Sequence, residues 1–124
     1  MTMIDHINLQ VGDLSTSRLF YETVLAPLGV HVAEEDESFA GFNGPGPGSF
    51  FLIPAEGSTD RELHIAFMAP DRAAVRAFFE AAVGIGAPVL HAPRVFPEYH
   101  EDYYGAFVRD PDGHNIEAVC HDKE

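Results

Sequence analysis

The chain has 124 residues, and its 7 Lys and Arg against 20 Asp and Glu give a formal net charge of −13. This acidity argues against nucleic acid and anionic membranes as partners, because both are bound by basic surfaces. With 46% hydrophobic residues the composition is that of a globular protein, and we expect a single domain over residues 1–124. One cysteine excludes an intrachain disulfide. Without a long apolar run or a signal-like start, the sequence predicts a cytoplasmic protein.

The sequence contains an internal repeat. Residues 5–30 align with residues 63–88 without a gap, and the apolar positions keep the same spacing. Two copies are too few for a solenoid, so the repeat predicts two similar modules, about 1–57 and about 58–124. The identical pairs are His6 and His64, Ile7 and Ile65, Asp13 and Asp71, Arg18 and Arg76, Phe20 and Phe78, and Glu22 and Glu80.

Each module is predicted to fold as a βαβββ unit. Alternating apolar residues indicate strands, and Asp13 and Asp71 stand where a helix N-cap is expected. The "DPDG" at 110–113 has Pro and Gly where a type I turn favours them, which predicts a hairpin. In the first module we expect a strand over 4–11, a helix over 14–25 and strands over 30–35, 38–43 and 49–54. In the second we expect a strand over 62–68, a helix over 72–83 and strands over 88–91, 103–109 and 114–120.

Three potential metal ligands fall on strand faces that the predicted helices leave uncovered. Side chains alternate across a strand, so His6 points away from the helix, and His64 does the same in the matching strand of the second module. Glu117 has this orientation in the last strand. If the modules pack edge to edge and curl, two imidazoles and one carboxylate line one cleft and suit Fe2+, Mn2+, Zn2+ or Ni2+. Taken singly, each residue also fits an ordinary core or surface position.

The segment 91–102, "HAPRVFPEYHED", is expected to be a long connection, and such loops often carry functional residues. His100 is a candidate acid or base, because histidine exchanges protons near neutral pH. Tyr103 or Tyr104 can orient a substrate; on the alternative interpretation one packs in the core and the other lies at the surface. His121 shares the ligand face of the last strand, where it either supports the ligands or is simply solvated.

Three stretches of the sequence carry a resemblance to a known family: "DHINLQVGDLSTSRLFYETVLAPLG" (5–29), "LHIAF" (63–67) and "YYGAFVRDPDGHNIEAV" (103–119). The chain resembles the vicinal oxygen chelate superfamily, which includes glyoxalase I, extradiol dioxygenases, fosfomycin-resistance enzymes and bleomycin-resistance proteins. The resemblance implies an α+β fold, in which two βαβββ modules form a cupped mixed sheet with helices outside, around one divalent metal. It also implies a homodimer, and metal ligands at His6, His64 and Glu117.

The sequence departs from the pattern of each subfamily. Glyoxalase I uses a fourth metal ligand on the last strand of the first module, and aligning 47–54 with 112–119 puts Leu52 at that position. Extradiol enzymes use a tyrosine on the penultimate strand, where this chain has Phe107. A lactoylglutathione activity is therefore not expected, and the three-ligand set is closer to the dioxygenases and the fosfomycin-resistance enzymes.

Two functions follow as hypotheses. The first is a divalent-metal-dependent enzyme that acts on a small molecule with neighbouring oxygens, as a dioxygenase, a lyase or isomerase, or a thiol or epoxide transferase. The metal would act there as a Lewis acid. The alternative is a small-molecule binding protein without catalysis, of the bleomycin-resistance type, for which the acidic balance would suit a cationic ligand.

Overall fold

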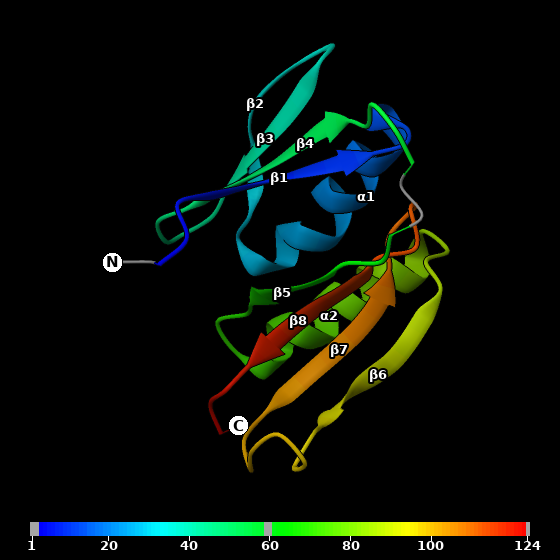
Figure 1. Cartoon of the computed structure of the whole chain (residues 1–124). Coiled ribbons are helices and arrows are strands. Elements are labelled where there is room, and N and C mark those ends of the chain that lie inside the picture. Colours follow the sequence, from blue (N-terminus) through cyan, green and yellow to red (C-terminus); the bar gives the residue numbers. More distant parts are fainter. Residues whose placement is uncertain (1–2, 59–60, 124) are drawn as a thin grey trace.

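In the computed structural model, which describes residues 3–58 and 61–123, the chain forms two four-stranded sheets with one long helix each (Figure 1). The first module contains β1 (His6–Val11), α1 (Leu14–Leu25), the short 3-10 helix η1 (Ala26–Leu28), β2 (His31–Asp36), β3 (Phe39–Asn43) and β4 (Ser49–Pro54). The second contains β5 (His64–Met68), α2 (Arg72–Gly84), β6 (Val89–Val95), β7 (Tyr104–Arg109) and β8 (Asn115–Cys120). The predicted pair of βαβββ modules is confirmed. The predicted long connection is shorter, because β6 continues to Val95.

The two sheets share one topology. The strand orders are β1-β4-β3-β2 and β5-β8-β7-β6, and the first strand of each module pairs in parallel with the last. The helix supplies the crossover that this arrangement requires. Among the described residues no strand of one sheet pairs with a strand of the other. The cupped sheet that the resemblance implies is thus present as two separate halves.

Both helices begin where the sequence predicts. The Asp13 side chain accepts a hydrogen bond from the Thr16 amide at 3.0 Å, and Asp71 accepts one from the Ala74 amide at 2.8 Å. The hydrogen bond from the Thr16 amide stabilises the ionised carboxyl of Asp13 and lowers its pKa. Gly29 ends η1 with a φ of 82°, a conformation that glycine adopts without a Cβ penalty.

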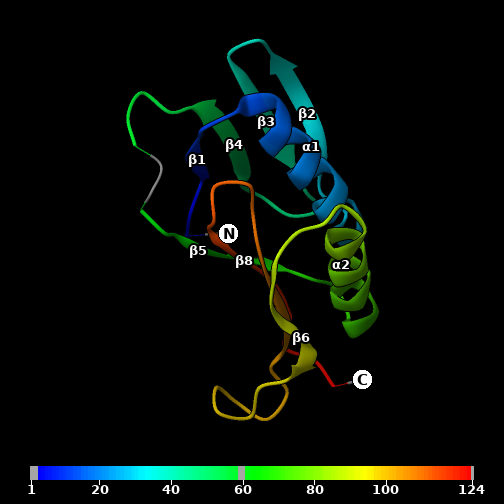
Figure 2. The ribbon, with the colours of Figure 1, turned by 90° about the vertical axis from the view of Figure 1, so that its right-hand side faces the viewer.

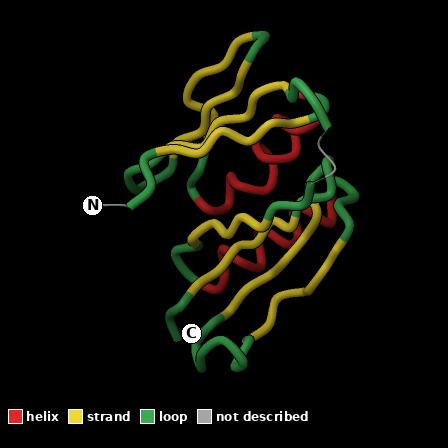
Figure 3. Tube along the Cα trace, in the orientation of Figure 1, coloured by secondary structure: helices red, strands yellow, loops and turns green. Residues whose placement is uncertain are grey.

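The core lies between the sheets and the helices, which sit side by side on one side of the molecule (Figures 2 and 3). Val24 and Leu25 of α1 and Val75 and Phe78 of α2 have no exposed surface. Apart from Ile7 and Leu63, which are exposed, and the partly buried Ile65 and Phe67, the strand residues that alternation assigns to the helix side are buried with them. They include Leu9, Val11, Leu52, Ile116, Ala118 and Cys120. In the described ranges 3–58 and 61–123, neither helix is long and apolar enough to cross a membrane.

The predicted turn at 110–113 also joins the two modules. Gly113 has a φ of 86°, and its amide bonds the Asp110 carbonyl at 2.9 Å, which closes the β7–β8 hairpin. The buried Asp110 carboxylate accepts a hydrogen bond from the hydroxyl of Tyr21 on α1. Asp112 accepts one at 3.1 Å from the amide of Gly12, just after β1. Burial, followed by the charge of Asp110, raises the pKa of Tyr21 well above its usual range.

Candidate metal centre

The centre of the candidate site is a contact between two neighbouring strands. His64 on β5 and Glu117 on β8 lie on the face of the second sheet that points away from α2, and His64 Nε2 is 2.8 Å from Glu117 Oε1. The His64 side chain keeps 53% of its surface exposed, whereas that of Glu117 keeps 1%. An imidazole at the surface thus meets a carboxylate set into the sheet.

Tyr103 holds the other side of Glu117. This residue directly precedes β7, and its hydroxyl donates a hydrogen bond to Oε2 of Glu117. Burial, and then the bond to the carboxylate, raises the pKa of Tyr103 above its usual range. The sequence predicts that Tyr103 orients a substrate; in the structure its hydroxyl is directed at the carboxylate.

Gly105 gives the tyrosine and the carboxylate room to meet. A Cβ at this buried position on β7 would lie 3.2 Å from Glu117 Oε2 and 3.4 Å from Tyr103 Cε1. The φ of Gly105 is not positive, so close packing accounts for the glycine. The sequence interpretation misses this residue, although a glycine inside a predicted strand signals a close approach.

Aromatic rings continue this face beyond the carboxylate. The ring centroid of Phe107 lies 5.8 Å from that of His64 and 5.3 Å from that of His91. Phe96 packs against Phe107 at 5.2 Å and stacks on Tyr99 at 5.8 Å. Because Phe107 is also the direct cross-strand neighbour of Glu117, it contributes to the apolar surroundings of the carboxylate. We call four of these residues the aromatic wall: His91, Phe96, Tyr103 and Phe107.

The structure places the other two candidates for catalysis apart from Glu117. His100 Nε2 lies 2.9 Å from His121 Nδ1, the two rings stack, and both pack edge-on against the ring of Tyr103. Tyr104 points to the helix side of the sheet, where its hydroxyl accepts a hydrogen bond from Arg76 at 3.4 Å. Of the three predicted residues, Tyr103 contacts the carboxylate directly, and His100 contacts Tyr103.

His6 lies on the other sheet. Its Nδ1 is 2.8 Å from Asp5 Oδ1, and its ring packs edge-on against Phe51 with centroids 5.9 Å apart. No group of three or more His, Cys, Asp or Glu side chains in the described parts of the chain is arranged to hold a metal ion. One chain therefore brings together two of the three predicted ligands, His64 and Glu117.

Strand pairing corrects the sequence alignment of the two modules. Glu117 lies opposite Ala66, two residues after His64, and Phe51 lies opposite Asn8, two residues after His6. The first-module position that corresponds to Glu117 is thus Phe51. Leu52, which the sequence alignment puts there, faces the helix side and has no exposed surface. The alignment is wrong by one residue because it lacks the register, and one residue reverses the face.

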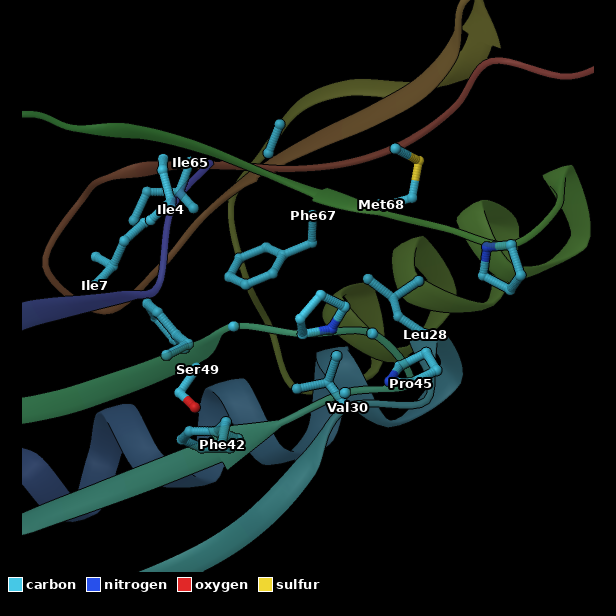
Figure 4. Close-up of a pocket in the computed structure, with 17 residues that line it drawn as sticks. Ile4, Ile7, Leu28, Val30, Phe42, Pro45, Ser49, Ile65, Phe67 and Met68 are labelled. Atoms are coloured by element: carbon cyan, nitrogen blue, oxygen red, sulfur yellow. The ribbon is translucent and has the colours of Figure 1, made fainter. Parts of the chain in front are cut away.

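An apolar groove of about 410 Å³ separates β1 from β5 (Figure 4). Phe67 and Met68 line it from β5, and Ile7 lines it from β1. Met68 is 68% exposed and Ile7 is 37% exposed, although alternation predicts that Ile7 faces the helix. The remaining lining includes Ile4, Leu28, Val30, Phe42, Phe50, Ile65 and residues 44–49.

The donor atoms that meet on the second sheet fit a divalent metal. An imidazole nitrogen and a carboxylate oxygen are the usual ligands of Fe2+, Mn2+, Zn2+ and Ni2+ in proteins. Here they lie 2.8 Å apart, and Tyr103 orients the carboxylate from its other side. His64 and Glu117 therefore supply two ligands of a metal site, and the other ligands must come from outside this sheet.

Two βαβββ modules, each opening with a histidine on the strand that pairs with the last strand of its sheet, define a fold of paired βαβββ modules. The sequence profile of the Glyoxalase/Bleomycin resistance protein/Dioxygenase superfamily matches residues 3–118. The chain belongs to this superfamily. None of the curated protein sequences matches it.

Solved structures agree with this membership. A glyoxalase/bleomycin resistance protein from Albidiferax ferrireducens T118 is 27% identical, with a TM-score of 0.80 over 96% of this chain and 99% of that chain. A lactoylglutathione lyase from Agrobacterium tumefaciens is 21% identical, with a TM-score of 0.71 over 97% of this chain and 94% of that chain. A glyoxalase/bleomycin resistance protein/dioxygenase family enzyme from Burkholderia phytofirmans PsJN is 19% identical, with a TM-score of 0.73 over 94% of this chain and 97% of that chain. The latter two likenesses concern the fold alone.

Proposed function

We propose that the protein is a divalent-metal-dependent enzyme that acts on a small molecule with neighbouring oxygens, with His6, His64 and Glu117 as metal ligands. The observation that carries the proposal is the contact of 2.8 Å between His64 Nε2 and Glu117 Oε1. A carboxylate without exposed surface is costly to keep charged unless it has partners. A cation bound beside His64 would supply the strongest of these. Membership of the superfamily, whose members generally bind a divalent metal, supports the same interpretation.

The third ligand is proposed to come from a second copy of the chain. His6 and His64 stand on β1 and β5, and among the described residues each of these strands pairs on one edge only. Free strand edges and exposed apolar residues are features that a partner usually covers. A homodimer with a two-fold axis would set β1 of one copy beside β5 of the other. Such a dimer would complete the cupped sheet and the ligand set together, and would cover the apolar groove.

The residues at this site would have different roles. A bound divalent metal supplies Lewis-acid chemistry, which stabilises negative charge on a coordinated substrate oxygen. Glu117 and His64 hold the ion, and Tyr103 fixes the carboxylate. The aromatic wall excludes water from one side of the site and offers ring surfaces to the substrate. The exposed pair of His100 and His121 packs against Tyr103 and would be close enough to exchange protons with a molecule bound there.

The class of reaction stays open between a dioxygenase, a lyase or isomerase, and a thiol or epoxide transferase. Phe51 in the place of a fourth ligand argues against the lactoylglutathione reaction, as does the small number of basic residues, 7 in all. We further propose a cytoplasmic location, because the single cysteine, Cys120, is free and buried, as in proteins of a reducing compartment.

Metal titration of untagged protein tests the proposal. We expect the metal-free protein to bind about one Mn2+ or Fe2+ per chain in calorimetry, and His64→Ala to lose this binding. Glu80→Gln, on the exposed face of α2, is the matched control. Wild-type protein that binds neither ion, whether or not it is dimeric, contradicts the metal site.

A binding protein of the bleomycin-resistance type is the second candidate. It is favoured by one observation, that a single chain offers an apolar groove of about 410 Å³ but no three-donor group in its described ranges. A metal-free protein that binds an apolar cationic dye would support it. Binding unaffected by His64→Ala and abolished by Phe67→Asp would place that ligand in the groove rather than at the His64–Glu117 pair.

A further inference from the structure

The two oxygens of Glu117 have different partners. Oε1 lies 2.8 Å from Nε2 of His64, which stands on the edge strand β5 and has a half-exposed imidazole. Oε2 accepts the hydrogen bond of the Tyr103 hydroxyl and points into the protein. A carboxylate can bind a metal through one oxygen or through both. In this chain the tyrosine already engages one of them.

We propose that Tyr103 is a positioning residue that reserves Oε2 of Glu117, so that the carboxylate binds the metal through Oε1 alone. The inference rests on the proposed function, because it describes how the same site receives its metal. Its consequence is a coordination position that stays open for the substrate, which a carboxylate bound through both oxygens would fill.

The backbone around Tyr103 keeps the hydroxyl in place. The Phe96 amide donates a hydrogen bond to the Tyr103 carbonyl at 2.7 Å, and the Tyr103 amide donates one to the His100 carbonyl at 3.2 Å. Both backbone groups of Tyr103 are therefore hydrogen-bonded. The rings of His100 and His121 pack edge-on against the tyrosine ring at 5.5 and 5.3 Å. A side chain held in this way loses little entropy when it bonds the carboxylate, which makes it suited to orient a ligand.

Gly105 leaves the space that the arrangement needs. A Cβ on this residue would stand 3.2 Å from Oε2 and 3.4 Å from Tyr103 Cε1, and it would also lie 3.4 Å from the Ala118 carbonyl. The contact of 3.2 Å is tighter than ordinary van der Waals contact, so the carboxylate would shift by a few tenths of an ångström. The first module lacks this arrangement, because Phe51 occupies the place of Glu117 and its ring covers Gly41.

Cobalt substitution tests the inference. Metal-free wild type, Tyr103→Phe and Tyr99→Phe are titrated with CoCl2 while the visible absorption is recorded, and the Mn2+ affinity of each is measured by calorimetry. Tyr99 stacks on Phe96 outside the aromatic wall and is 61% exposed, which makes Tyr99→Phe the matched control. For Tyr103→Phe we expect the Co2+ absorption to weaken, as it does when the coordination number rises, because the freed Oε2 joins the metal. We also expect Mn2+ affinity to fall about tenfold, as for other groups that orient a metal ligand.

A second variant leaves the hydroxyl intact. Gly105→Ala is expected to alter the Co2+ spectrum and to weaken Mn2+ binding in the same direction, whereas Gly57→Ala, at an open loop position, is expected to alter neither. Circular dichroism of each metal-free variant establishes that it is folded before titration. If Gly105→Ala has a wild-type spectrum and affinity, the role assigned to the glycine is overturned.

The possible failures are distinguishable. If wild-type protein binds no Co2+ and no Mn2+, the proposed function is overturned and the inference with it. If wild type binds both ions and Tyr103→Phe keeps the wild-type spectrum and affinity, the metal site stands and only the role of Tyr103 is overturned. If the Co2+ spectrum changes equally in Tyr99→Phe and Tyr103→Phe, the role of Tyr103 is also overturned. The hydrogen bond from the Tyr103 hydroxyl to Glu117 would then not be the cause of the change.

Discussion

His64 Nε2 lies 2.8 Å from Oε1 of Glu117, and these two residues, 53 positions apart in the sequence, belong to neighbouring parallel strands. The imidazole is half exposed, and the carboxylate is buried. This pairing places a carboxyl group inside the second sheet, where its side chain is 1% exposed. Its protein partners are His64 at Oε1 and Tyr103 at Oε2.

Neutralising the carboxylate should therefore remove the metal. Glu117→Gln keeps the shape of the side chain and the contact with Tyr103 but carries no charge. We expect its Mn2+ affinity in calorimetry to fall by at least about tenfold, since even groups that only orient a metal ligand are worth that much. An affinity within a factor of two of wild type would show that Glu117 is not a ligand.

The exposed apolar residues of the groove should matter for assembly. Met68 is 68% exposed in one chain, so Met68→Glu does not disturb the core, but it places a charge where the proposed dimer covers an apolar surface. We expect the dimer dissociation constant in sedimentation to rise at least about tenfold, which is about 1.4 kcal/mol. Leu19→Glu is the control, because Leu19 is 59% exposed on α1 and does not line the groove. Equal effects of the two substitutions would contradict this interface.

The link between Tyr21 and Asp110 should stabilise the pairing of the modules. Tyr21→Phe leaves the buried carboxylate without its hydroxyl partner, which costs about 1 to 3 kcal/mol of unfolding free energy. Urea denaturation measures this value, and Tyr99→Phe, which removes a hydroxyl from an exposed ring, should change stability by less than about 0.5 kcal/mol. A loss of equal size in both variants would mean that the buried link contributes nothing specific.

The same link predicts a loss of stability at alkaline pH. Burial and the Asp110 charge raise the pKa of Tyr21 in the folded protein, whereas an unfolded tyrosine ionises near its model value of 10.0. Above that pH the unfolded chain binds fewer protons than the folded one, so the unfolding free energy falls as pH rises. Between pH 10 and 11, wild type should lose about 1 kcal/mol more than Tyr21→Phe. Parallel pH profiles of the two proteins would contradict the shift.

Local patterns were enough to predict the modules. The helix over 14–25 coincides with α1, because an Asp cap precedes an amphipathic run and a Gly follows it. The repeat indicated that both modules share one topology, and alternation put His64 and Glu117 on one face. Their proximity follows from the pairing of β5 with β8.

Longer-range features lay beyond these patterns. Alternation assigns Glu117 to the uncovered face, but it does not reveal that Tyr103 reaches across to cover it. The shift from Leu52 to Phe51 depends on strand register, which no periodicity contains. The separation of His6 from His64 depends on how the two complete sheets associate, which no local pattern contains.

Mixed dimers test whether two chains share the metal site. His6→Ala and His64→Ala chains, purified with different tags that lack histidine, are unfolded, mixed and refolded together, and the dimer carrying both tags is isolated. A shared site predicts that this dimer recovers one Mn2+ site of wild-type affinity, built from the intact His6 of one chain and the intact His64 and Glu117 of the other, while neither parent dimer binds at that affinity. A mixed dimer that binds Mn2+ no better than its parents would contradict the shared site.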